Sequence, residues 1–289
     1  MSGSPSTARV WHIAGHTLPI GERTLVMGVL NVTPDSFSDG AQFLSPDKAL
    51  AHAAQMISEG ADIIDVGGES TRPGADLISP EEELHRVLPI IEMLTKRTAV
   101  PISIDTTKAV VARAALDAGA AIVNDISALR FDFHIADEVA KSAAGLVLMH
   151  SRGTPATMQR MPPVANILEE VTNSLLSSVA MAERRLVKRE SIVIDPGIGF
   201  GKTQEQNLEL IARLDRLVHA FPGFPILIGT SRKSFIGRLL DNAPATDRLH
   251  GTMAAITTAV LRGAHIVRVH DVKAAVETVR IADAIKDIV

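Results

Sequence analysis

Eight short apolar runs recur along the chain, and each one ends at a polar residue and is followed by a helix-like segment. The runs span residues 24–30, 63–66, 102–104, 122–123, 146–149, 192–194, 226–228 and 266–269. The polar groups at or just past their ends are Asn31, Glu69, Asp105, Asn124, His150, Asp195, Lys233 and His270. Continuous apolar strands are typical of parallel sheets, and polar strand ends indicate a barrel with a site at one mouth.

The repeat also predicts the domain organisation. A strand and helix alternation that occurs eight times fits a closed barrel better than an open doubly wound sheet. The first run is not followed by G-x-G-x-x-G, which argues against dinucleotide binding. A length of 289 residues suits one such domain. We therefore predict an α/β fold, a (β/α)8 TIM barrel spanning residues 1–289, with an N-terminal β-hairpin arm over residues 1–22.

Periodic apolar positions and capping signals predict the helices between the strands. Ser79 precedes Pro80, Glu81 and Glu82, which is the pattern of an N-cap, a first-turn proline and an acidic first turn. Trp11 and the two histidines of the arm are expected to serve packing and solvation. The predicted helices cover residues 46–59, 80–97, 108–118, 134–142, 164–188, 204–220, 246–262 and 272–286.

Composition excludes several classes of protein. The chain has no cysteine, so disulfides and thiolate metal sites are ruled out. A net charge of −4 with interspersed signs gives no general electrostatic case for binding nucleic acid or an anionic membrane. No apolar run approaches the length of a membrane span, and residues 1–10 lack the apolar core of a signal peptide. A cytoplasmic location is therefore expected.

Two long loops carry the first chemical signal. They are the segments Asn31–Gly40, of sequence NVTPDSFSDG, and Gly67–Gly74, of sequence GGESTRPG. Either loop alone could be an ordinary surface connection, but two in succession at one barrel face favour a binding role. Asn31 offers a neutral oxygen ligand suited to Mg²⁺, and Arg72 offers a fork of donors suited to phosphate or carboxylate.

Further motifs follow at the ends of later runs and complete a resemblance. They are SIDT at 103–106, NDI at 124–126, DPGIGFGK at 195–202, SRKS at 231–234 and RVHDV at 268–272. With the two loops, these segments closely resemble the dihydropteroate synthase family, in the same order and over about residues 25–289. The single-domain length is similar to the bacterial, monofunctional form.

The resemblance implies a transferase of folate biosynthesis. The family joins 6-hydroxymethyl-7,8-dihydropterin pyrophosphate to p-aminobenzoate, releases pyrophosphate and forms 7,8-dihydropteroate by an SN1-like route. It implies Mg²⁺ as a cofactor, held at Asn31, sulfonamides as inhibitors that mimic p-aminobenzoate, and a homodimer. No nucleophilic residue is needed, because catalysis would rest on positioning and electrostatics.

The pterin contacts implied by the resemblance agree with the chemistry of the residues. A pterin edge presents an N–H and an amino group side by side, and a carboxylate can accept both, which suits Asp195. A strand-end aspartate could instead cap the next turn, and Lys233 could be a solvated lysine, but their convergence at one mouth favours a site. The implied pterin-binding set is Asp105, Asn124, Ile126, Met149, Asp195, Lys233 and Arg268.

The remaining implied residues divide between an anion pocket, a second-substrate pocket and catalysis. In a strand, Arg268 and His270 point to the same side, which favours a shared anion contact. The pyrophosphate set is Asn31, Arg72, Arg268 and His270. The p-aminobenzoate set is Phe37, Thr71, Pro73, Phe200 and Ser234. The catalytic set is Asp35, Lys233 and Arg268, with Asp35 expected to stabilise the pterin-methyl cation or the closed loop.

One departure from the family pattern and two alternatives remain. Many members have Met-His-Met-Gln-Gly where this chain has Met149-His150-Ser151-Arg152-Gly153, which places only the local loop in doubt. His150 is predicted to be structural. The alternatives are a methyltetrahydrofolate–corrinoid methyltransferase, which would lack the pyrophosphate set, and a non-catalytic paralogue that only binds pterin.

Overall fold

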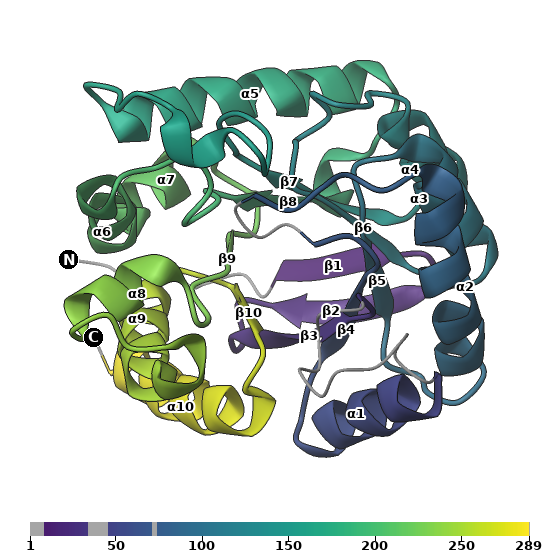
Figure 1. Ribbon diagram of the computed structural model, residues 1–289, viewed down its shortest axis with the longest axis horizontal. Coiled ribbons are helices and arrows are strands. Elements are labelled where there is room, and N and C mark those ends of the chain that lie inside the picture. Colours follow the sequence, from purple (N-terminus) through teal and green to yellow (C-terminus); the bar gives the residue numbers. More distant parts are fainter. Residues whose placement is uncertain (1–8, 34–45, 71–73, 289) are drawn as a thin grey trace.

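The centre of the molecule is a sheet of parallel strands that curls into a barrel (Figure 1). A computed structural model describes residues 9–33, 46–70 and 74–288. The eight strands lie in the order β8-β7-β6-β5-β4-β3-β10-β9. Their bounds are β3 Leu25–Asn31, β4 Ile63–Gly67, β5 Ile102–Asp105, β6 Ile122–Asp125, β7 Gly145–Met149, β8 Ile192–Asp195, β9 Leu227–Ile228 and β10 Ile266–Val269. The predicted barrel is confirmed.

The two outer strands of this order meet and almost close the ring. Ile194 of β8 forms a parallel bridge with Ile226, and its amide donates to the Pro225 carbonyl over 3.0 Å. The register then aligns the strand ends, because Asn31 pairs with Gly67, Gly67 with Asp105, and Asp105 with Asn124. The sheet hydrogen bonds therefore fix the polar strand ends side by side at one mouth.

Helices surround the barrel, as the periodicity predicted. Ser79 caps α2 by accepting from the Glu82 amide over 3.2 Å, and α10 has the predicted bounds. The predicted helix 204–220 is divided at Arg213, whose φ of −114° and ψ of 29° leave the helical region. The helices are α1 Pro46–Ser58, α2 Pro80–Thr95, α3 Ala109–Asp117, α4 Ile135–Ser142, α5 Ile167–Arg184, α6 Gln204–Ala212, α7 Leu214–Ala220, α8 Ser234–Leu239, α9 Leu249–Leu261 and α10 Val272–Lys286.

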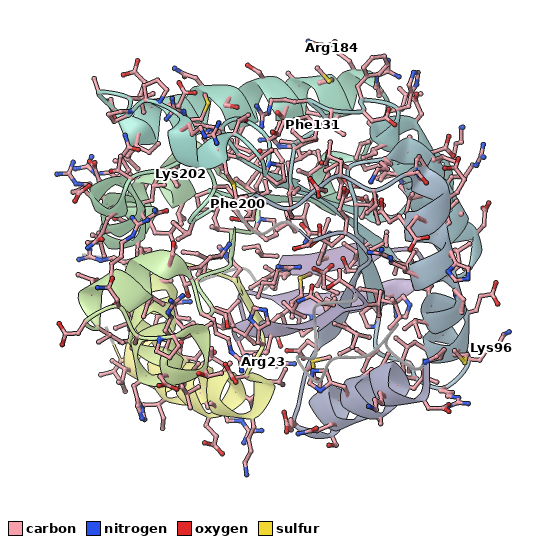
Figure 2. All side chains as sticks on the ribbon, viewed as in Figure 1. Arg23, Lys96, Phe131, Arg184, Phe200 and Lys202 are labelled. Atoms are coloured by element: carbon pink, nitrogen blue, oxygen red, sulfur yellow. The ribbon has the colours of Figure 1, made fainter. Side chains whose placement is uncertain are left out.

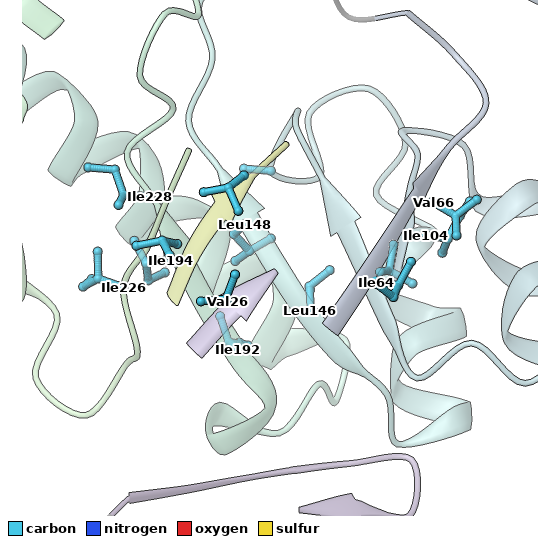
Figure 3. Packing of buried hydrophobic residues seen from close by; sticks show 14 of the residues in the cluster. Val26, Ile64, Val66, Ile104, Leu146, Leu148, Ile192, Ile194, Ile226 and Ile228 are labelled. Carbon is cyan, nitrogen blue, oxygen red and sulfur yellow. The ribbon is translucent and has the colours of Figure 1, made fainter. Parts of the chain in front are cut away.

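Aliphatic side chains fill the space between the sheet and these helices. Figure 3 shows part of this layer, in which Ile64, Ile104 and Ile194 are fully buried. Burial of each such side chain stabilises the fold by about 1.5–3 kcal/mol. Among the helices that are described, none has both the length and the apolar character that crossing a lipid bilayer requires. The layer holds each strand end in a rigid position.

The N-terminal arm is a hairpin of β1 Arg9–Ile13 and β2 His16–Ile20, and it covers the amino end of the barrel (Figure 1). Trp11 is fully buried there, and its indole Nε1 donates to the Ser191 carbonyl over 3.1 Å. A Cβ on Gly145 would lie 2.6 Å from the Trp11 ring, so only glycine fits at that contact. The predicted packing role of Trp11 is confirmed, and the opposite, carboxyl mouth is left for the site.

Candidate functional site

Four strands contribute to an ionic network at the carboxyl mouth. Arg268 of β10 donates from Nε to Asp65 Oδ2 over 2.6 Å and from Nη2 to Asp105 Oδ2 over 2.7 Å. Asn124 donates from Nδ2 to the same Asp65 oxygen over 3.0 Å. Three of the predicted site residues, Asp105, Asn124 and Arg268, are thus brought together, and two nitrogens of the arginine are held by carboxylates.

Asp65 is the member of this network that the sequence prediction missed. It lies inside β4 and is completely buried, and its Oδ1 accepts no hydrogen bond from any described residue. A buried carboxylate is costly unless it is paired, so its partners Arg268 and Asn124 compensate for that cost. An acidic residue within the buried strand sequence Ile-Ile-Asp-Val was the available signal.

Asn31 stands at the end of β3, beside the network. A Cβ built on Gly67 would lie 3.6 Å from Asn31 Oδ1 and 3.8 Å from Asp105 Oδ2. The two oxygen-bearing side chains therefore flank Gly67 from the neighbouring strands. A side chain at this position would be in van der Waals contact with both of them.

Two carboxyl groups of the mouth, those of Asp195 and Asp105, have raised pKa values. Burial raises the pKa of Asp195 to about 6, while the Gly197 amide, which donates to Oδ1 over 2.6 Å, opposes the rise. Burial raises the pKa of Asp105 to about 7 against the attraction of Arg268. Perturbed pKa values that arise from burial and a specific charge partner are typical of functional sites.

Lys233 lies on the side of the mouth formed by α8. Burial, together with the charge of Arg268, lowers the pKa of Lys233 to about 8. Its Nζ lies 4.1 Å from the centre of the Phe200 ring, which is labelled in Figure 2. Phe200 shares a small apolar cluster with Ile126, Met149 and Met158, of which Met158 was not predicted. The cluster gives this part of the mouth an apolar wall.

His270 follows β10 and faces the loop after β9. Its backbone amide and its Nδ1 both lie within hydrogen-bond distance of Ser231 Oγ, at 3.2 and 3.0 Å. Burial lowers the pKa of His270 to about 3, with Arg268 adding to the effect. The imidazole is therefore neutral at pH 7, and it can meet an anion as a hydrogen-bond donor but not as a cation.

Comparison with known proteins shows the family to which the chain belongs. The family model described as "Pterin binding enzyme" matches residues 27–270. The dihydropteroate synthase of Synechocystis sp. is 49% identical over 92% of this chain and 91% of its own length. The chain belongs to the dihydropteroate synthase family. As a member, it is an enzyme, a transferase of folate biosynthesis.

Solved structures of the family share the whole fold. The Yersinia pestis dihydropteroate synthase, solved with a sulfonamide drug complex, superposes with a TM-score of 0.90 at 40% identity and covers 97% of this chain and 100% of that chain. The Xanthomonas albilineans dihydropteroate synthase, solved with 4-aminobenzoic acid, gives a TM-score of 0.89 at 42% identity over 97% and 99% of the two chains. The family's barrel is therefore preserved along nearly the full length.

Two residues near the mouth have structural partners within the family fold. Glu69 accepts from Lys108 over 2.6 Å and from the Ile78 amide over 3.0 Å, and so supports the loop after β4. His150 is buried, and its amide donates to the Asp195 carbonyl over 2.9 Å. Burial lowers the pKa of His150 to about 2, so this imidazole is neutral.

The Ser-Arg departure in the loop after β7 has partners as well. Ser151 accepts from Arg130 Nη2 over 2.6 Å, and Arg152 donates from Nη1 to the Gly201 carbonyl over 3.2 Å. Ser234, the first residue of α8, is exposed. The predicted residues Asp35, Phe37, Thr71, Arg72 and Pro73 lie outside the described residues, so their roles remain predictions.

Proposed function

We propose that the carboxyl mouth binds dihydropterin pyrophosphate and p-aminobenzoate in adjoining subsites and joins them to give dihydropteroate and pyrophosphate. The convergence of Asp105, Asn124 and Asp195 with Lys233 and Arg268 at one barrel mouth carries the proposal. Residues 1–289 act in it as one domain.

The pterin subsite takes its specificity from hydrogen bonding. Asp195, when ionised, accepts from the N–H and the amino group of the pterin edge, and Asn124 and Asp105 contact other polar atoms of the ring. Lys233 donates to a ring acceptor, and the flat guanidinium of Arg268 stacks on the ring face. Ile126 and Met149 supply an apolar floor, in keeping with their burial beside Phe200.

The second subsite holds p-aminobenzoate beside Phe200, with the N-terminus of α8 and Ser234 receiving its carboxylate. Thr71, Pro73 and Phe37 complete this subsite from the two long loops. The Xanthomonas albilineans and Yersinia pestis relatives were solved with 4-aminobenzoic acid and with a sulfonamide drug, which supports a site of this chemical class here. Sulfonamides should therefore compete with p-aminobenzoate for this chain.

The leaving pyrophosphate is received by Asn31, Arg72, Arg268 and the neutral His270. Across residues 9–33, 46–70 and 74–288, no three His, Asp or Glu side chains gather as a resident metal site would need. A single amide oxygen at Asn31 fits Mg²⁺ that arrives with pyrophosphate, because Mg²⁺ commonly uses few protein ligands together with phosphate oxygens and water. Bound there, it would neutralise charge on the leaving group.

The reaction follows an SN1-like order. The bond between the pterin methylene carbon and the pyrophosphate oxygen breaks, and its electron pair leaves with pyrophosphate. The electron-rich ring and the nearby carboxylates, including Asp35, stabilise the resulting pterin-methyl cation. The amine nitrogen of p-aminobenzoate then attacks the methylene carbon and loses a proton. The protein contributes alignment of the two substrates and a preorganised electrostatic environment.

A coupled assay for pyrophosphate release tests the proposal. Release should require both substrates and should match the amount of dihydropteroate formed. Failure to turn over while the pterin still binds would instead indicate a non-catalytic pterin-binding protein. Transfer of a methyl group from methyltetrahydrofolate to a corrinoid protein would indicate the methyltransferase alternative. Sedimentation at equilibrium tests the homodimer that we also propose.

A further inference from the structure

Lys202 is a buried cation that the proposed chemistry does not use. It follows β8 in the loop that leads to α6, is 9% exposed, and is labelled in Figure 2. Its Nζ donates to the carbonyls of Gly197 over 2.7 Å, Phe200 over 3.1 Å and His150 over 3.2 Å. Three acceptors require three N–H donors, so this geometry is satisfied by the ammonium form.

The loop around Lys202 is shaped so that these carbonyls converge. Gly197 and Gly201 have φ values of +66° and +68°, and a Cβ on either residue would lie 1.8 or 2.4 Å from a carbonyl oxygen of the loop after β7. Asn207 of α6 accepts from the Gly199 amide over 2.6 Å. Without a central cation, the carbonyls of Gly197, Phe200 and His150 would be buried and would repel one another.

No ion pair offers another explanation for Lys202. Among the described residues, no carboxylate lies within ion-pair distance of its Nζ. The charged and titratable groups that act on it are Asp195 of β8, Lys233 at the start of α8, Arg152 and His150 after β7, and Arg130 after β6. Burial lowers the pKa of Lys202 well below its usual range, with Asp195 opposing the change. The three carbonyl acceptors oppose this change as well, because they bind the ammonium form.

The three carbonyls connect Lys202 to both subsites. The carbonyl of Phe200 accepts from Lys202, and the ring of Phe200 lies 4.1 Å from Lys233 Nζ. Gly197 contributes another carbonyl, and its amide donates to Asp195 Oδ1 over 2.6 Å. Lys202 is therefore bonded both to the residue that carries the aromatic ring and to the residue whose amide donates to Asp195.

We propose that Lys202 is a positioning residue that holds the Phe200 wall of the p-aminobenzoate subsite, and the Gly197 donor of Asp195, without touching either substrate. The assignment rests on the function proposed above. The positive charge of Lys202 also favours the ionised form of Asp195. Loss of that charge therefore raises the pKa of Asp195, in addition to loosening the loop.

Lys202→Met, which keeps the length of the side chain but removes its charge and donors, tests the proposal. The KM for p-aminobenzoate should rise about tenfold or more, with a smaller change in kcat at saturation, because a misplaced wall weakens alignment of the second substrate. The pH below which the affinity for pterin is lost should also move to a higher value. Lys188→Met, at an exposed lysine, is the matched control and should keep both values.

A double-mutant cycle separates positioning from general loosening. If Lys202 acts through Phe200, the double variant should raise the KM for p-aminobenzoate much less than the combined effects of Lys202→Met and Phe200→Leu would predict. Full additivity, or an unchanged KM in folded Lys202→Met, would overturn the proposal. If Lys202→Met does not fold, Lys202→Arg serves instead, because its planar fork cannot serve three converging carbonyls. A wild-type KM in that variant would equally overturn it.

Refutation of the positioning role of Lys202 can be distinguished from refutation of the proposed synthase function. Absence of turnover in the wild type would refute the synthase function itself. In that case, calorimetric binding of a sulfonamide to the wild type and to Lys202→Met still tests the positioning role. Equal affinities would overturn it, and an affinity about tenfold weaker in the variant would support it.

Discussion

The proposed role of Asp195 requires an ionised carboxylate, but its buried location disfavours that charge. Its proposed role is to accept two donors, which only the ionised carboxylate can do fully. Burial nevertheless raises its pKa to about 6, and the amide of Gly197 and the charges of Lys233 and Lys202 keep it from rising further. Small changes around this one residue should therefore be visible in the pH dependence of binding.

Pterin binding is expected to weaken as the pH falls. Because the pKa of Asp195 is raised to about 6, its ionised form predominates above that pH and is lost below it. Asp105, with a pKa of about 7, titrates in the same direction. Between about pH 8 and about pH 5 the Kd measured by calorimetry should rise about tenfold or more, since one unit below its pKa a carboxyl is about one-tenth ionised.

Variants assign this pH dependence to Asp195. Asp195→Asn should bind pterin much more weakly and should lose the component that has its midpoint near pH 6. Asp76→Asn, at an exposed carboxylate, should keep the wild-type profile. A wild-type Kd that does not change with pH would show that the ionisation of Asp195 has no part in binding.

The residues of the mouth were predicted from sequence to different degrees. Asp105, Asn124 and Asp195 stand at strand ends, where pattern and resemblance coincide. Asp65 lies within a strand, and its partners Asn124 and Arg268 come from distant parts of the chain, so sequence alone did not single it out. The role of Lys202 was not predicted, because its Nζ donates to backbone carbonyls, which every residue has and which the sequence therefore does not distinguish.

At the scale of elements, two neighbouring loops are locked together. Arg232, in the loop after β9, donates to Asp271 at the start of α10 through Nε over 3.0 Å and Nη2 over 2.5 Å. Arg232 has a φ of +58°, an unusual value for a residue with a side chain. Its carbonyl accepts from Arg248 and its amide donates to Thr252, so four contacts hold the strained turn.

Asp271→Asn is expected to release this turn. The change removes the charge that pairs with Arg232, and Lys233, the next residue, should lose its fixed position. We expect kcat/KM to fall about tenfold, while the free energy of unfolding falls by about 1 kcal/mol for the partly exposed pair. Asp287→Asn, at the exposed far end of α10, should change neither value. Wild-type kcat/KM in Asp271→Asn would mean that the pair does not position Lys233.

The helices and strands were predicted most accurately where the local sequence pattern is strongest. α10 was predicted with its observed bounds because it has a long, regular apolar period and a defined start. α8 was not predicted, since six residues carry too little periodicity to identify. The predicted helix 204–220 contains a break at Arg213 that a continuous apolar pattern does not reveal. β9 has only two residues, and its place in the sheet depends on its neighbours.

At the scale of the whole molecule, stability and chemistry lie at opposite ends of the barrel. The hairpin buries Trp11 and Ile13 against the amino ends of the strands, where they pack with Ile122 and Val193. Asp105, Asp195, Lys233 and His270, whose pKa values are shifted by burial, lie at the carboxyl mouth. This division is general in barrels of this kind, since the carboxyl ends of the strands lead into the functional loops.

Trp11→Ala should therefore reduce stability with little effect on catalysis. Removal of a fully buried tryptophan should lower the free energy of unfolding by about 3–5 kcal/mol, measured by denaturant unfolding. At a temperature where the variant remains folded, kcat/KM should stay within about twofold of the wild type. Val10→Ala, on the exposed side of the same strand, is the matched control. A large rise in either KM would contradict the separation.

We propose above all that the carboxyl mouth binds the pterin ring through Asp195 and places p-aminobenzoate beside Phe200. A crystal structure with dihydropterin pyrophosphate and an unreactive p-aminobenzoate analogue measures this most directly. We expect both oxygens of Asp195 within about 2.7–3.0 Å of the ring N–H and amino nitrogens, and the analogue in contact with the Phe200 ring. A pterin bound away from Asp195, or an analogue bound outside the mouth, would contradict the claim.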